Sequence, residues 1–185
     1  MAEAAALSVN WDVIVIGAGA AGMMCAIRAA QRGRSVIVLD HAKTPGEKIR
    51  ISGGGRCNFT NVNAGPANFL SQNPDFCRSA LARYTPTQFV RLVESYGIAY
   101  HEKKLGQLFC DDSALDIIAM LKSECARGGV QWRMPCAVDG ITREGDRFVV
   151  ATTHGSVRCS SLVIATGGLT VPKLGATPFG YRIAE

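Results

Sequence analysis

The chain has 185 residues, of which 48% are hydrophobic and 19% are charged, and its formal net charge is +5. This length supports a domain with a core of its own, and the composition is typical of a soluble globular protein. We interpret the 20 lysines and arginines as scattered, without a basic stripe interleaved with aromatic residues, and therefore expect no nucleic-acid partner.

The sequence also shows no pattern typical of a targeting signal. Residues 1–10 carry no basic residue, and the apolar run that follows them is interrupted by glycines, which argues against a secretory signal or a membrane helix. The seven cysteines include no C-x-x-C pair, so neither a zinc site nor a disulfide framework is indicated. We expect a cytoplasmic protein with no membrane partner, no metal and a disordered leader over residues 1–10.

The first predicted elements surround a glycine turn. Residues Trp11–Ile16 are strand-like, and the alanine-rich stretch Ala20–Gln31 predicts a helix. Between them Gly17, Gly19 and Gly22 complete the G-x-G-x-x-G dinucleotide fingerprint. The first glycine permits the turn, the second lets a pyrophosphate approach the backbone, and the third lets the helix pack closely. The anion is then expected at the N-terminus of the helix.

A second strand is predicted over Ser35–Leu39 and is followed by Asp40. Asp40 lies 18 residues after Gly22, near the spacing of the carboxylate that binds a ribose hydroxyl. An acidic residue here disfavours the 2′-phosphate of NADP. Two alternatives stay open, namely a βαβ unit without a ligand and a solvated Asp40 at a strand end.

Residues 44–65 predict a long functional loop with one helical turn at most. Its glycine run offers backbone N–H groups without side-chain obstruction, which suits a phosphate. Lys48, Arg50 and Arg56 are candidates for neutralising the phosphate charge. Arg56 is the preferred one because glycines precede it, although a solvated loop charge is the alternative.

Further along, Thr85, Pro86 and Gln88 form a capping box that predicts a helix ending at Gly97. A β-hairpin is predicted over Ile98–Cys110. A second helix is predicted to begin at Asp112 or Ser113 and to end at Gly128 and Gly129.

The last third of the chain predicts short strands. Val130–Met134 is the expected third parallel strand, and a three-stranded meander is expected over Ala137–Thr142, Arg147–Thr153 and Ser156–Cys159. A separate buried strand, Leu162–Ala165, should follow, and then Thr166-Gly167-Gly168. The chain halts within a helix that starts at Phe179, which is typical of a fragment.

Two motifs carry a family resemblance: the run K-I-x-x-S-G-G-G-R-C-N-x-T-N from Lys48 and A-T-G-G-x-x-x-P-x-x-G from Ala165. Together with the first glycine turn they resemble the HI0933-like flavoproteins, also described as aminoacetone-oxidase-like or BaiN-like NAD(P)/FAD-dependent oxidoreductases. Relatives often have Arg and Pro where Gln107 and Cys110 stand here. The resemblance implies an α/β, Rossmann-like FAD-binding domain of the glutathione-reductase type with a β-meander, over residues 11–185. It also implies that an inserted second domain and a C-terminal return segment are missing.

The resemblance implies contacts with FAD along the whole cofactor. The first turn would hold the pyrophosphate, Asp40 the adenosine ribose, and the backbone of Val138 the adenine, unless Val138 is a plain core valine. The second glycine run would wrap the ribityl chain, and Cys57 and Asn58 would face the isoalloxazine, with a packed Cys57 favoured over a redox-active thiol. The expected FAD-binding residues are Gly17, Gly19, Ala20, Gly22, Asp40, Lys48, Ser52, Gly53, Gly54, Gly55, Arg56, Cys57, Asn58, Val138, Thr166 and Gly167.

These features predict an FAD-dependent oxidoreductase that moves a hydride to or from a small organic substrate, with NAD(P)H as a candidate electron donor. No residue has the setting of a general base, and His41, His101 and His154 are assigned no catalytic role. A non-catalytic or truncated flavin- or nucleotide-binding module is the alternative. A simple NAD-dependent dehydrogenase is disfavoured because it has no need of the run from Ser52 to Asn58.

Overall fold

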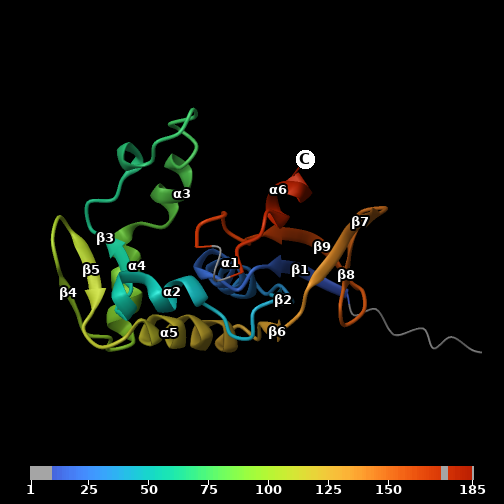
Figure 1. Ribbon diagram of the computed structural model, residues 1–185, viewed down its shortest axis with the longest axis horizontal. Coiled ribbons are helices and arrows are strands. Elements are labelled where there is room, and N and C mark those ends of the chain that lie inside the picture. The colour runs from blue at the N-terminus through green and yellow to red at the C-terminus, as the bar shows by residue number, and fades with distance from the viewer. Residues whose placement is uncertain (1–9, 172–174, 185) are drawn as a thin grey trace, which may run out of the picture. The chain divides into compact units, whose positions relative to one another are not determined.

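The computed structural model describes residues 10–171 and 175–184 (Figure 1). The chain divides into two compact units. Unit 1 contains the chain up to Lys48 and again from Leu121, and unit 2 is Ile49–Met120. Of the predicted leader, residues 1–9 lie outside the described residues, and Asn10 already belongs to the first strand.

Unit 1 is built on a six-stranded sheet in the order β6-β2-β1-β9-β8-β7. The strands β6, β2, β1 and β9 run parallel to one another, and β9, β8 and β7 form an antiparallel meander. Their bounds are β1 Asn10–Ile16, β2 Val36–Leu39, β6 Gln131–Arg133, β7 Val138–Glu144, β8 Arg147–Thr152 and β9 Val157–Ile164. Helix α1, Ala20–Ala30, connects β1 to β2 and packs on both. The predicted βαβ unit and third parallel strand are therefore confirmed.

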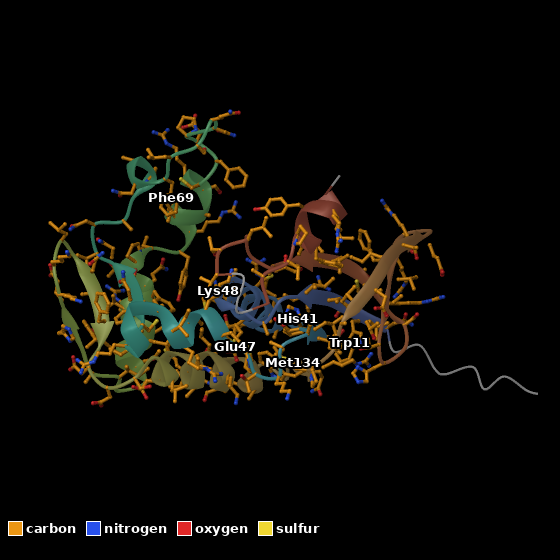
Figure 2. All side chains as sticks on the ribbon, viewed as in Figure 1. Trp11, His41, Glu47, Lys48, Phe69 and Met134 are labelled. Atoms are coloured by element: carbon orange, nitrogen blue, oxygen red, sulfur yellow. The ribbon has the colours of Figure 1, made fainter. Side chains whose placement is uncertain are left out.

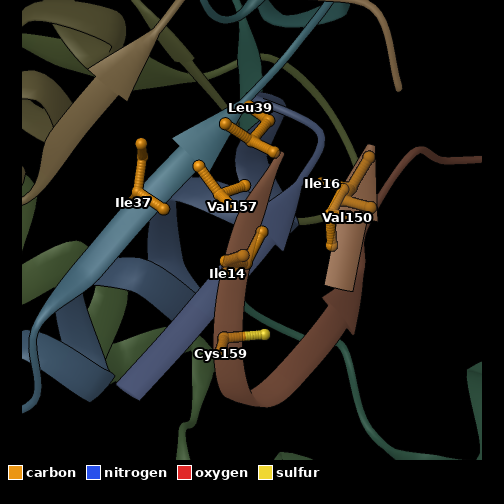
Figure 3. Close-up of a cluster of buried hydrophobic side chains, with 7 residues drawn as sticks. All are labelled: Ile14, Ile16, Ile37, Leu39, Val150, Val157 and Cys159. Atoms are coloured by element: carbon orange, nitrogen blue, oxygen red, sulfur yellow. The ribbon is translucent and has the colours of Figure 1, made fainter. Parts of the chain in front are cut away.

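The core of unit 1 follows from the apolar runs of its parallel strands. Strands that are covered on both faces lack alternation, and all four residues of β2 are buried. A cluster of buried side chains joins β1 and β2 to the meander strands (Figure 3), with Ile14, Ile16, Ile37, Leu39, Val150, Val157 and Cys159 as its members.

One strand prediction was wrong. Ser156–Cys159 and Leu162–Ala165, expected as two strands, form the single strand β9. Its first half pairs antiparallel with β8, while the stretch from Arg158 to Ile164 pairs parallel with β1. The pairing with β8 stops at Cys159, so the end of β9 has only one neighbouring strand there. This explains why Ile164 is 37% exposed rather than fully buried.

Unit 2 contains a three-stranded antiparallel sheet in the order β3-β5-β4. Its strands are β3 Asn58–Asn61, β4 Tyr100–Glu102 and β5 Gln107–Cys110. The helices α3, Arg78–Arg83, and α4, Pro86–Ser95, lie between β3 and β4. Short 3-10 turns occupy Ser52–Gly55 and Pro66–Asn68. Helix α2, Glu47–Ile51, begins at the end of unit 1, and α5, Ala114–Arg127, continues from unit 2 into unit 1.

Predictions for unit 2 are confirmed where the interacting residues lie close together in the sequence. The Gln88 N–H donates to Thr85 Oγ1 at 3.3 Å, and the Thr85 N–H donates to Gln88 Oε1 at 2.8 Å, which is the predicted capping box. The hairpin of β4 and β5 is also confirmed. The loop predicted over residues 44–65 was wrong, because it contains α2, a 3-10 turn and β3. Strand β3 pairs with β5, far away in sequence, and leaves no local signal.

Among the described residues, no helix combines the length and apolarity that a bilayer crossing requires.

Candidate functional site

The first glycine turn is shaped by close packing at two of its three glycines. A Cβ on Gly17 would lie 2.4 Å from the Ala165 carbonyl oxygen, and the φ of Gly17 is +111°. A Cβ on Gly22 would lie 1.8 Å from the Gly17 carbonyl oxygen. Neither position has room for a side chain, so the motif fixes α1 closely against the turn and the turn against the segment after β9.

Gly19 differs from both, because a Cβ there would meet nothing within 4 Å. Gly19 is the N-cap residue of α1 with an ordinary φ of −80°, and no side chain caps the helix. No acidic residue lies in its first turn. The N-terminal N–H groups of a helix have no partner within the helix and carry partial positive charge. This end of α1, including Ala20, thus fits an anionic pyrophosphate.

Asp40 holds the glycine turn in a way that the sequence did not reveal. Its carboxylate accepts the Ala18 N–H at 2.6 Å and the Ala42 N–H at 2.8 Å. Its backbone carbonyl accepts the Cys136 N–H at 2.7 Å, and its side chain is 16% exposed. His41 Nδ1 lies 3.6 Å from the carboxylate. Asp40 therefore positions the turn, and its role with a ribose stays a prediction.

The segment after β9 reaches the same turn. The Ala165 N–H donates to the Ile16 carbonyl at 2.8 Å, and Gly167 has a φ of +73°. Lys48 Nζ donates to the Gly168 carbonyl and to Thr170 Oγ1, both at 3.1 Å. Figure 2 labels Lys48 and His41. Lys48 thus ties α2 to the 168–170 segment, a structural role beyond the predicted one.

A pocket of about 250 Å³ brings four of the expected residues together. Gly17, Asp40, Val138 and Thr166 line it, although they come from four different elements of unit 1. Convergence of loops at the carboxyl ends of parallel strands is where open α/β sheets bind ligands. The sequence missed several other lining residues, among them His41, Cys136, Phe179 and Arg182.

The helix predicted to start at Phe179 is confirmed as α6, Phe179–Ala184, but its residues were not predicted to line the site because they follow the last recognised motif. These residues reach the site because α6 packs closely against Thr166. A Cβ on Gly180 would lie 2.7 Å from Thr166 Oγ1, so the glycine lets α6 contact the segment after β9. Arg182 brings a positive charge to the pocket, which suits an anionic ligand. The sequence Phe179-Gly180-Tyr181-Arg182, a glycine between two aromatic residues with an arginine after them, could have indicated these pocket residues.

The second glycine run lies in unit 2. Gly53, Gly54 and Gly55 have φ values of 60°, 69° and 86°. A Cβ on Gly53 would lie 2.7 Å from the Phe109 ring, whereas Gly54 and Gly55 face open space. The Cys57 N–H closes the turn by donating to the Ser52 carbonyl at 2.9 Å. The run exposes backbone as predicted, and its approach to the turn at Gly17 stays a prediction.

The three residues after the second run have separate environments. Arg56 is exposed. Cys57 is 4% exposed, and burial raises the pKa of its thiol while its hydrogen bond with Ser52 acts in the opposite direction. A raised pKa keeps the thiol protonated and unreactive, in line with a packed cysteine. The Asn58 amide nitrogen donates to the Leu108 and Thr60 carbonyls at 3.3 and 3.1 Å once its oxygen and nitrogen are exchanged.

The HI0933-like protein Rossmann domain matches residues 11–185. The chain belongs to the HI0933-like family. It is 55% identical over 176 residues to the ribosomal RNA dihydrouridine synthase of Escherichia coli, and 53% identical to that of Haemophilus influenzae. These matches cover 95% and 93% of this chain but 44% of each relative. The 3-dehydro-bile acid delta(4,6)-reductase of Clostridium scindens is 26% identical over 92% of the chain and 42% of its own length.

Solved structures agree on the fold. The glycine oxidase of Geobacillus kaustophilus superposes with a TM-score of 0.63 at 19% identity, covering 90% of this chain and 58% of that protein. The predicted family and the predicted α/β, Rossmann-like FAD-binding fold are confirmed, and the family is one of oxidoreductases. This HI0933-like chain spans less than half the length of the curated relatives it matches.

The expectation of no nucleic-acid partner was wrong. Two relatives that are more than 50% identical are named for ribosomal RNA. The net charge of +5 was summed over the whole chain, so it did not show that residues 49–91 combine five arginines with one carboxylate. The composition of this chain also corresponds to only 44% of the length of the Escherichia coli relative.

Proposed function

We propose that this chain is the FAD-binding part of an enzyme that reduces uridine to dihydrouridine in ribosomal RNA. The observation that carries the proposal is 55% identity across nearly the whole chain to a ribosomal RNA dihydrouridine synthase. Identity at this level extends through both units rather than one motif, so substrate class is expected to be shared. Ribosomal RNA and seven free cysteines both suit the cytoplasm.

FAD is the cofactor that the site fits best. The uncapped end of α1 and the open space at Gly19 suit its pyrophosphate. The pocket lined by Asp40 and Val138 would suit its adenosine, and Arg182, which also lines the pocket, would offer a positive charge to its phosphates. In unit 2 the backbone of Gly54 and Gly55 is accessible for its ribityl chain. When bound, FAD supplies a hydride that it receives from NAD(P)H.

The chemistry of the substrate explains why one family can include such different named enzymes. The C5=C6 bond of uridine is conjugated with the C4 carbonyl, so a hydride adds at C6 and a proton at C5. A delta(4,6) bile acid with a 3-oxo group likewise presents carbon–carbon double bonds conjugated with a carbonyl. We infer that the shared reaction is reduction of a double bond activated by a carbonyl, and that NAD(P)H and one proton balance it.

A reductase of small unsaturated ketones is the second candidate, and the bile-acid reductase relative favours it. The two differ in the acceptor and not in the flavin site. A binding module without catalysis would share the flavin site and lack both reactions.

The test uses the full-length protein with NADPH and ribosomal RNA from cells that lack its gene. Nucleoside mass spectrometry is expected to show dihydrouridine, and Gly19→Val is expected to abolish it. Gly140→Val is the matched control, because a Cβ on Gly140 also meets nothing within 4 Å but lies in β7. Flavin-loaded protein that reduces an unsaturated ketone and leaves the RNA unchanged would contradict the proposal. Failure of both reactions would leave a binding module.

A further inference from the structure

Most of the chain's net positive charge lies in one short stretch. Residues 49–91 contain five arginines, no lysine and one carboxylate, so their formal charge is +4 against +5 for the whole chain. The single carboxylate is Asp75, and the arginines are Arg50, Arg56, Arg78, Arg83 and Arg91. Arginine without lysine is typical of surfaces that bind phosphates in pairs of hydrogen bonds and stack on planar groups.

The middle of this stretch, Val62–Tyr84, is an arm between β3 and α4 that extends away from the sheet of unit 2 (Figure 1). None of its residues, all of which the structure describes, is buried. Local turns hold it instead of a core. The Gly65 N–H donates to Asn68 Oδ1 at 2.8 Å, and the Asp75 N–H donates to Asn73 Oδ1 at 3.2 Å.

The arm presents large apolar side chains to solvent. Leu70 is 95% exposed, Phe76 83%, Val62 50% and Phe69 48% (Figure 2 labels Phe69). Neither phenylalanine contacts another ring among the described residues. By contrast, aromatic rings at the foot of the arm pack on one another, with Phe59, Tyr84, Phe89 and Tyr100 as members. Exposed apolar side chains gathered on one short segment are typical of an interaction site.

We propose that the arm is the surface that binds unpaired nucleotides of the RNA substrate, an inference that rests on the proposed function. Single-stranded RNA is bound by stacking of bases on aromatic rings and by arginines along the phosphates. Phe69 and Phe76 supply the rings, and Arg78 and Arg83 supply the cations. Amide side chains that can pair with base edges lie along the arm, although the Oδ1 atoms of two of them already accept backbone N–H groups of the arm: Asn63, Asn68, Gln72 and Asn73.

The ion pair on the arm does not oppose this. Arg78 Nε lies 3.2 Å from Asp75 Oδ1, and the two side chains are 69% and 74% exposed. Exposed pairs of this kind contribute little and are screened by salt. The terminal nitrogens of Arg78 stay available for phosphate. An apolar protein partner is less suited to the arm, because amides flank Phe69 and Leu70, and Arg78 and Arg83 follow Phe76.

The test measures binding of a single-stranded RNA oligonucleotide to the full-length, flavin-loaded protein by fluorescence anisotropy across a range of salt concentrations. Phe69→Ala and Phe76→Ala are each expected to weaken binding about tenfold. Arg78→Gln with Arg83→Gln should lower the slope of log affinity against log salt by about 1.4. Leu115→Ala is the control, since Leu115 is 53% exposed outside the arm.

Flavin absorbance and NADPH oxidation with an artificial electron acceptor should be unchanged in all the arm variants. Wild-type affinity for RNA in these variants would overturn the inference while leaving the proposed function intact. Loss of flavin or solubility with unchanged RNA affinity would also overturn it, because the arm would then pack on protein. Wild-type protein that neither binds nor modifies RNA would instead refute the proposed function itself.

Discussion

The glycine turn of unit 1, Gly17–Gly22, and that of unit 2, Gly53–Gly55, require glycine for different reasons. In unit 1, Gly17 and Gly22 are required by contacts with neighbouring backbone, and only Gly19 faces open space. In unit 2, Gly54 and Gly55 face open space, and positive φ angles are what demand glycine there. Packing against neighbouring backbone therefore dominates in the first turn, whereas at Gly54 and Gly55 of the second only the backbone conformation requires glycine. Substitutions should separate these two causes.

The largest effect is expected at Gly22. In Gly22→Ala the new Cβ would lie 1.8 Å from the Gly17 carbonyl oxygen, so α1 must move away from the turn. We expect a loss of about 3 kcal/mol or more in the free energy of unfolding. Chemical denaturation measures this, with Gly19→Ala as a control that should unfold like the wild type. An unchanged midpoint for Gly22→Ala would show that packing does not hold the first turn.

Each unit contains a buried cysteine whose raised pKa makes the stability of the protein depend on pH. Burial raises the pKa of Cys110 in unit 2 and of Cys125 in unit 1 to about 12, from an ordinary value of 9.0. The nearby Cys57 adds to the effect at Cys110, and Glu124 adds to it at Cys125. Because the folded pKa is raised, the stabilisation is complete below pH 9.0 and is lost as pH rises toward 12.

The thermal unfolding midpoint of the protein should therefore decrease as the pH rises from 9.0 to about 12. Cys110→Ala and Cys125→Ala should each make that fall shallower, whatever they do to the midpoint at neutral pH. A pH dependence that neither variant changes would show that these thiols titrate alike in the folded and unfolded chain.

A smaller difference is expected within the second run. Gly54→Ala should cost about 1 kcal/mol, because its φ of 69° is unfavourable for alanine but no atom is in the way. Gly53→Ala should cost more, since its Cβ would also lie 2.7 Å from the Phe109 ring. Urea unfolding compares the two. Equal losses would mean that the Phe109 ring yields without cost.

Local physics explains which features were predictable from the sequence. The motif at Gly17, the capping box at Thr85 and the hairpin before Cys110 each depend on residues close in the chain. Strand β3 and the continuity of β9 depend on partners far away, and neither leaves a periodic signal.

The candidate site divides in the same way. Asp40 was found by its spacing, but its hydrogen bond with the Ala18 N–H belongs to the folded turn. Arg182 and Phe179 reach the pocket because Gly180 allows α6 to approach Thr166, which no motif encodes. The arginine stretch in unit 2 was visible in the sequence, but the net charge summed over the whole chain did not show it.

The most direct measurement of the central claim is the visible absorption spectrum of the purified full-length protein. The wild type and Gly140→Val are expected to show the flavin band near ~450 nm. Gly19→Val is expected to lose that band while its unfolding midpoint stays that of the cofactor-free wild type, because the open space at Gly19 is where the pyrophosphate would lie. A Gly19→Val protein that retains a full complement of flavin would contradict the account.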